Sequence, residues 1–107
     1  FFNGQSAKKQ EMIQIAESQK MKVAIESYLK NLDPEALTPN GKIKSYRILK
    51  DKLKYNPMEG IIVEIVINRD DRLTIDMTVV EEDSGEYLVA TSGTPKELTK
   101  LIERDKQ

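Results

Sequence analysis

Two stretches in the middle of the chain have the apolar pattern of β-strands, and a short polar stretch separates them. The first covers residues 61–68 and places on one face Ile61, Val63, Ile65 and Ile67. The second covers residues 73–80 and places on one face Leu73, Ile75, Met77 and Val79. Strand patterns on both sides of a polar turn predict an antiparallel β-hairpin, and the second stretch shows the clean alternation of a half-buried strand. Because the first stretch is apolar on nearly both faces, we expect it to be a central strand.

Residues 5–32 contain no Gly or Pro and are rich in helix-forming residues, so they predict one long helix. Its apolar residues form two stripes on opposite faces, and the stripe that begins at residue 21 is expected to pack on the sheet. The other stripe contains Met12, Ile15, Ala16 and Val23. Two interpretations of it stay open: an interface for a homo-oligomer or another protein, or a bend that brings both stripes to one core. We therefore divide the chain into a helical overhang or stalk, residues 1–20, and a single α+β domain, residues 21–107.

The remaining elements follow from shorter patterns. Residues 42–49 predict a strand that continues towards residue 55, and residues 86–91 predict a short last strand. Thr94, Pro95 and Glu97 form the sequence of a helix start, and the buried stripe of that helix would be Leu98, Leu101 and Ile102. The predicted fold class is α+β, with the order α-β-β-β-β-α: a long N-terminal helix on an antiparallel sheet of about four strands, and a short C-terminal helix.

Composition narrows the chemistry that the chain can perform. The 107 residues include no Cys and no His, which excludes disulfides, thiol nucleophiles, Cys/His zinc sites and a histidine base. The net charge is −1 and aromatic residues make up 6%, so the chain lacks the basic surface and the aromatic platforms of a nucleic-acid-binding protein. We assign no catalytic residue, no cofactor and no metal ligand.

The segment from Asn31 to Ile61 carries a resemblance. It reads Asn31-Leu32-Asp33-Pro34-Glu35-Ala36-Leu37-Thr38-Pro39-Asn40-Gly41, then Ile43-Lys44-Ser45-Tyr46, and later Tyr55-Asn56-Pro57-Met58-Glu59-Gly60-Ile61. It resembles a family of small proteins from Gram-positive bacteria, domain of unknown function 1310. The resemblance covers residues 20–80 and implies an extracytoplasmic location, either membrane-anchored or secreted. Phe1 and Phe2 would then end a hydrophobic segment that is absent from this chain and would hold the protein at the membrane.

Several surface clusters are candidate sites. Glu81, Glu82, Asp83 and Glu86 match no calcium-loop spacing, and Asp70 and Asp71 are typical turn residues. A basic strip in residues 42–54 would attract anionic lipids or wall polymers, or would protect an edge strand against pairing: Lys42, Lys44, Arg47, Lys50, Lys52 and Lys54. Three tyrosines would line a groove for a peptide or glycan, or would be half-buried packing: Tyr46, Tyr55 and Tyr87.

Together these patterns predict a non-catalytic extracytoplasmic module that binds a protein or a component of the cell envelope. The alternative is a small hydrolase that uses carboxylates to act on cell-wall polymers. Only Glu64 and Asp76, on neighbouring strands of the predicted hairpin, are placed to form its acid pair.

Overall fold

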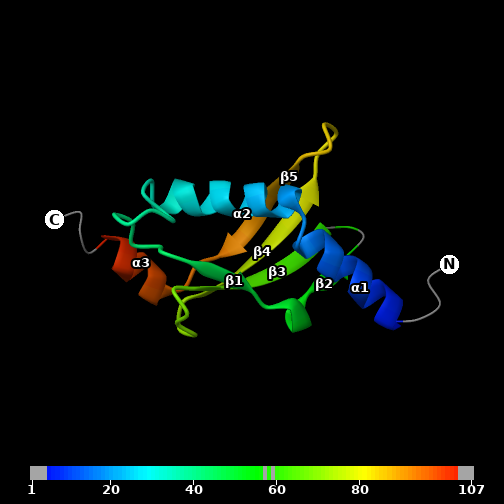
Figure 1. The fold of residues 1–107 in the computed structure, drawn as a ribbon, viewed down its shortest axis with the longest axis horizontal. Coiled ribbons are helices and arrows are strands. Elements are labelled where there is room, and N and C mark those ends of the chain that lie inside the picture. The colour runs from blue at the N-terminus through cyan, green and yellow to red at the C-terminus, as the bar shows by residue number, and fades with distance from the viewer. Residues whose placement is uncertain (1–4, 57, 59, 104–107) are drawn as a thin grey trace.

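The computed structural model of the chain describes residues 5–56, 58 and 60–103, so Phe1 and Phe2 lie outside the described residues. The described part is elongated, with extents of 55 × 30 × 23 Å. Helices α1 and α3 lie at opposite ends of it, and α2 lies across the sheet (Figure 1). The elements in chain order are α1 (Gln5–Ala16), α2 (Gln19–Leu32), β1 (Tyr46–Ile48), the 3-10 turn η1 (Lys50–Lys52), β2 (Lys54–Asn56), β3 (Gly60–Ile67), β4 (Thr74–Glu81), β5 (Tyr87–Gly93) and α3 (Lys96–Glu103).

All strand pairs in the sheet are antiparallel, and the order is β1-β3-β4-β5 with β2 also paired to β3. The predicted hairpin is therefore confirmed, with β3 as a central strand. The strand predicted over residues 42–55 is instead two short strands on the same edge of β3. Between them η1 turns the chain, and Leu53 is buried in the core. The sheet therefore has five strands where about four were predicted.

One face of the sheet carries the core. The inner positions of β3 and β4 are buried, as their alternation predicts, and Met21, Ile25 and Leu29 of α2 are fully buried against the same cluster. Leu98 of α3 completes it, with Leu101 and Ile102 packed around it, so the predicted stripe of the last helix is confirmed. Burial of such a side chain contributes roughly 1.5–3 kcal/mol, so this face supplies most of the stability of the fold.

The prediction of one long N-terminal helix is wrong. Helix α1 ends at Ala16, and Ser18 adopts an extended conformation as the N-cap of α2. The Ser18 hydroxyl accepts a hydrogen bond from the Met21 N–H (3.2 Å) and donates one to the Ile15 carbonyl (2.7 Å). The Ser18 side chain therefore provides a hydrogen-bond partner for a carbonyl at the end of α1 and for an N–H at the start of α2, which stabilises the break between the two helices although it contains no Gly or Pro.

The break decides where the second apolar stripe lies. Ala16 is buried in the core, and Met12 and Ile15 are half-buried against it. The bend therefore brings these residues to the same core as α2, which is one of the two interpretations left open by the sequence. Val23 is different, because 53% of it is exposed on α2. The start of α1 projects past the sheet (Figure 1).

Candidate functional site

The motif that carries the family resemblance closes a loop after α2. Asp33 is the one buried polar residue in the described chain, and its carboxylate accepts hydrogen bonds from the backbone N–H groups of Lys42 (2.7 Å), Ile43 (3.0 Å) and Glu35 (3.2 Å). Burial raises the pKa of Asp33, but the three N–H donors outweigh burial and hold this pKa below its ordinary value. At Gly41 a Cβ atom would overlap the Glu35 carbonyl oxygen. These motif residues therefore have structural roles.

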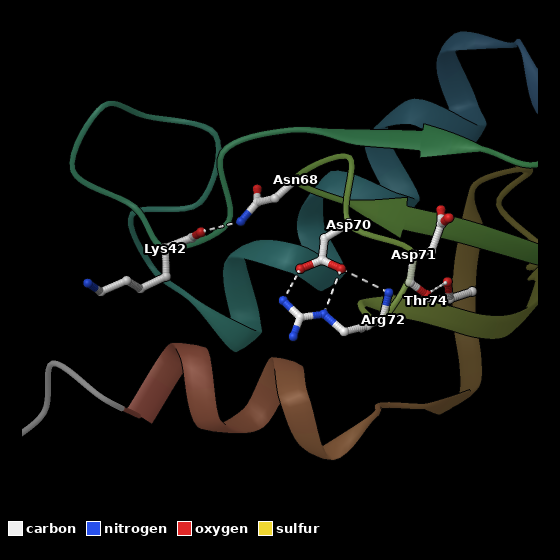
Figure 2. A network of polar contacts seen from close by, with 6 residues as sticks. All are labelled: Lys42, Asn68, Asp70, Asp71, Arg72 and Thr74. Carbon is white, nitrogen blue, oxygen red and sulfur yellow. Dashed lines mark hydrogen bonds and ion pairs between the residues drawn. The ribbon is translucent and has the colours of Figure 1, made fainter.

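The β3–β4 hairpin joins this loop (Figure 2). The Asn68 side chain donates to the Lys42 carbonyl (2.8 Å) and accepts from the Lys44 N–H (2.7 Å). At the tip, Arg72 forms two side-chain hydrogen bonds to Asp70, at 2.8 and 3.1 Å, which lower the pKa of Asp70. The Asp71 carbonyl accepts from the Thr74 hydroxyl. The two adjacent aspartates therefore have the roles of turn residues.

Four acidic residues, which we call the acidic cluster, lie at the end of β4 and on the turn to β5: Glu81, Glu82, Asp83 and Glu86. Glu82 N–H donates to the Glu86 carbonyl (2.8 Å), and the Ser84 hydroxyl lies 3.3 Å from the Glu86 carboxylate. Over residues 5–56, 58 and 60–103, no group of three or more Asp, Glu, His or Cys side chains is arranged to hold a metal ion. The cluster gives this end of the sheet a negative charge.

The basic strip is divided by the fold. The Lys44 ammonium donates to the carbonyls of Pro39 (3.1 Å) and Gly41 (2.7 Å), and the Lys50 ammonium pairs with Glu17. Arg47 and Lys54 lie opposite outward-facing positions of β3, so they sit on the face away from the core. The strip follows the edge of the sheet without forming one continuous basic surface.

Glu64 and Asp76 do lie together. They are directly opposite each other in the β3–β4 register, on the face of the sheet away from the core. Glu64 is half-buried and Asp76 is exposed. Neither lines either of the two pockets described next.

A pocket of about 190 Å³ opens between α1 and the end of the sheet. Two of the three predicted tyrosines, Tyr55 and Tyr87, lie in its wall. The full lining is Ile15, Tyr55, Gly60, Ile61, Val79, Val80, Glu81 and Tyr87. Tyr46 is elsewhere, in a pocket of about 410 Å³ beside the α1–α2 junction, and its hydroxyl donates to the Glu26 carboxylate (3.0 Å). Burial raises the pKa of Tyr46, and the hydrogen bond to Glu26 raises it further.

The smaller pocket has an apolar wall and a charged rim. Lys20 lies 5.6 Å from the centre of the Tyr87 ring and 3.8 Å from the Glu81 carboxylate, so it connects α2 to this rim. Gly60 has φ +121°, and a Cβ there would overlap the Val79 carbonyl oxygen, so the backbone at the pocket floor requires glycine. Sequence reasoning missed Ile15 and Gly60 as lining residues. For Gly60, the only signal in the sequence was a glycine directly before the predicted strand that begins at residue 61.

Exposed apolar side chains gather at the same end of the molecule. Among described residues, the large hydrophobic side chains with high exposure are Val23, Tyr55 (65%), Met58 (91%) and Leu88 (48%). Tyr55 lies in the pocket wall, Met58 lies in the connection between β2 and β3, and Leu88 is next to Tyr87. Of the four, Tyr55 lines the pocket, which we call the tyrosine pocket, whereas Met58 and Leu88 lie at the same end of the sheet without lining it.

The fold and these surfaces define a small α+β domain with helices on one face of an antiparallel sheet. The chain belongs to the family described as protein of unknown function DUF1310, whose family model matches residues 1–101. No curated protein and no solved structure matches the chain. None of the helices in the described residues has the length and apolar character needed to cross a membrane.

Proposed function

We propose that this chain is a non-catalytic extracytoplasmic module that binds a protein or an envelope component, with the tyrosine pocket at the centre of the contact. The observation that carries the proposal is the exposure of Tyr55 and Met58 beside an open apolar pocket. Aromatic residues and Met are enriched in interfaces because they supply large contact area. Isolated exposed hydrophobic residues need no explanation, but a group around a concave surface does.

The size of the pocket favours a macromolecular partner. Pockets for small ligands usually hold about 300–1,000 Å³, and the tyrosine pocket is smaller, at about 190 Å³. A volume of this size suits one side chain of a partner, with the exposed Met58 next to it in the connection between β2 and β3. The acidic residues of the β4–β5 turn lie beside the pocket, so a partner with a basic residue next to its apolar anchor fits best.

The extracytoplasmic location is part of the same proposal and rests on the family resemblance. It is tested by adding protease to intact Gram-positive cells that produce the natural protein. Degradation of the domain without lysis supports the location, whereas degradation only after lysis contradicts it.

The binding part is tested by capture on intact cells with this domain as bait, in three forms: the unchanged chain, Tyr55→Ser and Val23→Ser. Both substitutions remove an exposed apolar side chain, so Val23→Ser is the matched control. We expect Tyr55→Ser to lose the captured partner and Val23→Ser to retain it. Loss with Val23→Ser alone would move the interface to α2, and retention in all forms would contradict a role for the pocket.

The hydrolase alternative has one supporting observation. Residues directly opposite each other in an antiparallel pair have Cβ atoms roughly 5 Å apart, so Glu64 and Asp76 can approach the separation of about 5–5.5 Å used by retaining glycosidases. The test is turnover of isolated wall polymer by the unchanged chain and by Glu64→Gln and Asp76→Asn. Turnover that both substitutions abolish would support this alternative in place of the binding module.

A further inference from the structure

The rim of the tyrosine pocket combines a carboxylate, an aromatic ring and an apolar floor. Glu81 and Tyr87 lie directly opposite each other in the β4–β5 register. Side chains alternate between the two faces of a strand, so Glu81 is on the same face as the buried Val79. Val79 in turn pairs with Ile61, which pairs with Tyr55 of β2. An ammonium group at the end of an alkyl chain matches such a surface, because the methylene groups contact the apolar floor while the charge meets the carboxylate and the ring.

Lys20 of α2 places its ammonium group on this rim. Lys20 Nζ lies 5.6 Å from the centre of the Tyr87 ring and 3.8 Å from the Glu81 carboxylate. A Cβ atom on Gly85 would lie 3.7 Å from the same nitrogen, so the ammonium group also lies close to the backbone of the β4–β5 turn. A ring, a carboxylate and a turn therefore surround one cation, and a side chain of the same molecule shows which chemical group the rim accommodates.

The ion pair between Lys20 and Glu81 is weak. Their side chains are 55% and 60% exposed, and the two charged atoms are 3.8 Å apart. An ion pair that water surrounds contributes little to stability, because the solvent screens both charges and the long side chains lose freedom when they pair. Lys20 can therefore leave the rim at a small cost in free energy.

The negative charge around the rim exceeds what Lys20 neutralises. The acidic cluster supplies four carboxylates to this end of the sheet, and residues 73–95 contain no Lys or Arg. Because Lys20 is one cation, the rim still attracts a second cation while Lys20 occupies it. This charge favours a partner whose contact residue is basic, and it disfavours an acidic one.

We propose that the rim of the tyrosine pocket binds a lysine side chain of a partner protein, and that Lys20 occupies the same position until the partner displaces it. This inference rests on the proposed function, because it identifies the chemical group of the partner that contacts the site. The partner's lysine lies along Ile61 and Val79, with its ammonium group between Glu81 and Tyr87. Lys20 lowers the affinity of the site, since each binding event first removes an internal competitor.

The test is a titration of the purified chain, followed by NMR at the backbone amides of Glu81 and Tyr87. The probe is N-acetyl-lysine methylamide at concentrations up to about 50 mM, because a single side chain supplies only weak affinity. The matched control is N-acetyl-norleucine methylamide, which has the same alkyl chain without the ammonium group. We expect the lysine probe to shift both amides to saturation and the norleucine probe to bind at least about threefold more weakly. Equal binding of the two probes, or a response to glucosamine that exceeds the response to the lysine probe, would overturn the proposal.

Three variants, each at an exposed position, test the roles of single charges. Glu81→Gln should weaken binding of the lysine probe by about two- to fivefold, the range of an exposed ion pair, and Lys20→Met should strengthen it by a similar factor. Glu103→Gln also removes one negative charge, but on α3 at the other end of the molecule (Figure 1), and should leave the affinity unchanged. An affinity that does not change in Glu81→Gln or in Lys20→Met would contradict the proposal.

The titration contains no partner, so it separates this inference from the proposed function. If Tyr55→Ser loses the captured partner but the lysine probe does not bind, the lysine assignment is wrong and the pocket is still the binding site. If the lysine probe binds and Tyr55→Ser retains the partner, the cation site is supported and the proposed function is contradicted.

Discussion

Removal of the Asp33 carboxylate tests how the family motif holds its loop. In Asp33→Ala, three backbone N–H groups lose their acceptor, and the Ile43 N–H is in a buried position. A hydrogen bond to a charged group contributes roughly 1.5–3 kcal/mol, and an unsatisfied buried donor costs about 1–3 kcal/mol. The N–H groups of Lys42 and Glu35 are only partly buried, so water can replace part of what they lose. We expect the free energy of unfolding to fall by about 3 kcal/mol.

The assay is urea unfolding followed by circular dichroism, with Asp71→Ala as the control because Asp71 is exposed. The pKa of Asp33 is lowered in the fold, so its contribution is present above the unfolded pKa of about 3.9 and is lost as pH falls through the folded pKa. The difference in free energy of unfolding between the unchanged chain and Asp33→Ala should therefore become smaller below about pH 4. Equal free energies of unfolding for Asp33→Ala and Asp71→Ala at neutral pH would contradict this role of Asp33, as would a destabilisation by Asp33→Ala that does not change with pH.

Two further predictions concern other buried contacts. Gly41→Ala should destabilise the fold by about 2 kcal/mol or more, because the new Cβ would overlap the Glu35 carbonyl. Gly93→Ala is the control: its Cβ would meet only the Asp76 side chain, at 3.7 Å, so the urea midpoint should change little. The raised pKa of Tyr46 means that its contribution is present below the unfolded pKa of about 10 and is lost as pH rises towards the folded value. Tyr46→Phe, which also loses the hydrogen bond to Glu26, should therefore be less stable than the unchanged chain near neutral pH. This deficit in the free energy of unfolding should shrink above about pH 10 in the same assay, and a deficit that does not change with pH would contradict the raised pKa of Tyr46.

Local periodicity was sufficient to predict the centre of the fold. The apolar run over residues 61–67 predicted a central strand, and the alternation over residues 73–79 predicted its half-buried partner and the face that is buried. The last helix was predicted for a similar reason, since Thr94 and Pro95 mark a helix start and Leu98 begins its buried stripe. The pairing of Glu64 with Asp76 was also expected from adjacent strands.

The parts that could not be predicted depend on contacts distant in sequence. Ser18 is acceptable inside a helix, and only the packing of Ala16 on the core makes it a cap between two helices. The strand over residues 42–55 is broken because Leu53 reaches the core, which the alternation alone does not show. The tyrosine pocket joins Ile15 to Tyr87, and no local pattern brings these residues together.

The central claim is that the end of the sheet around Tyr55 contacts a partner. It is tested most directly by placing a photo-crosslinking amino acid at Tyr55 and, as a control, at Thr99 on α3, which is also exposed. Irradiation of intact cells should give one reproducible covalent adduct at position 55 and none at position 99. Absence of an adduct at position 55, or the same adducts at both positions, would contradict the claim.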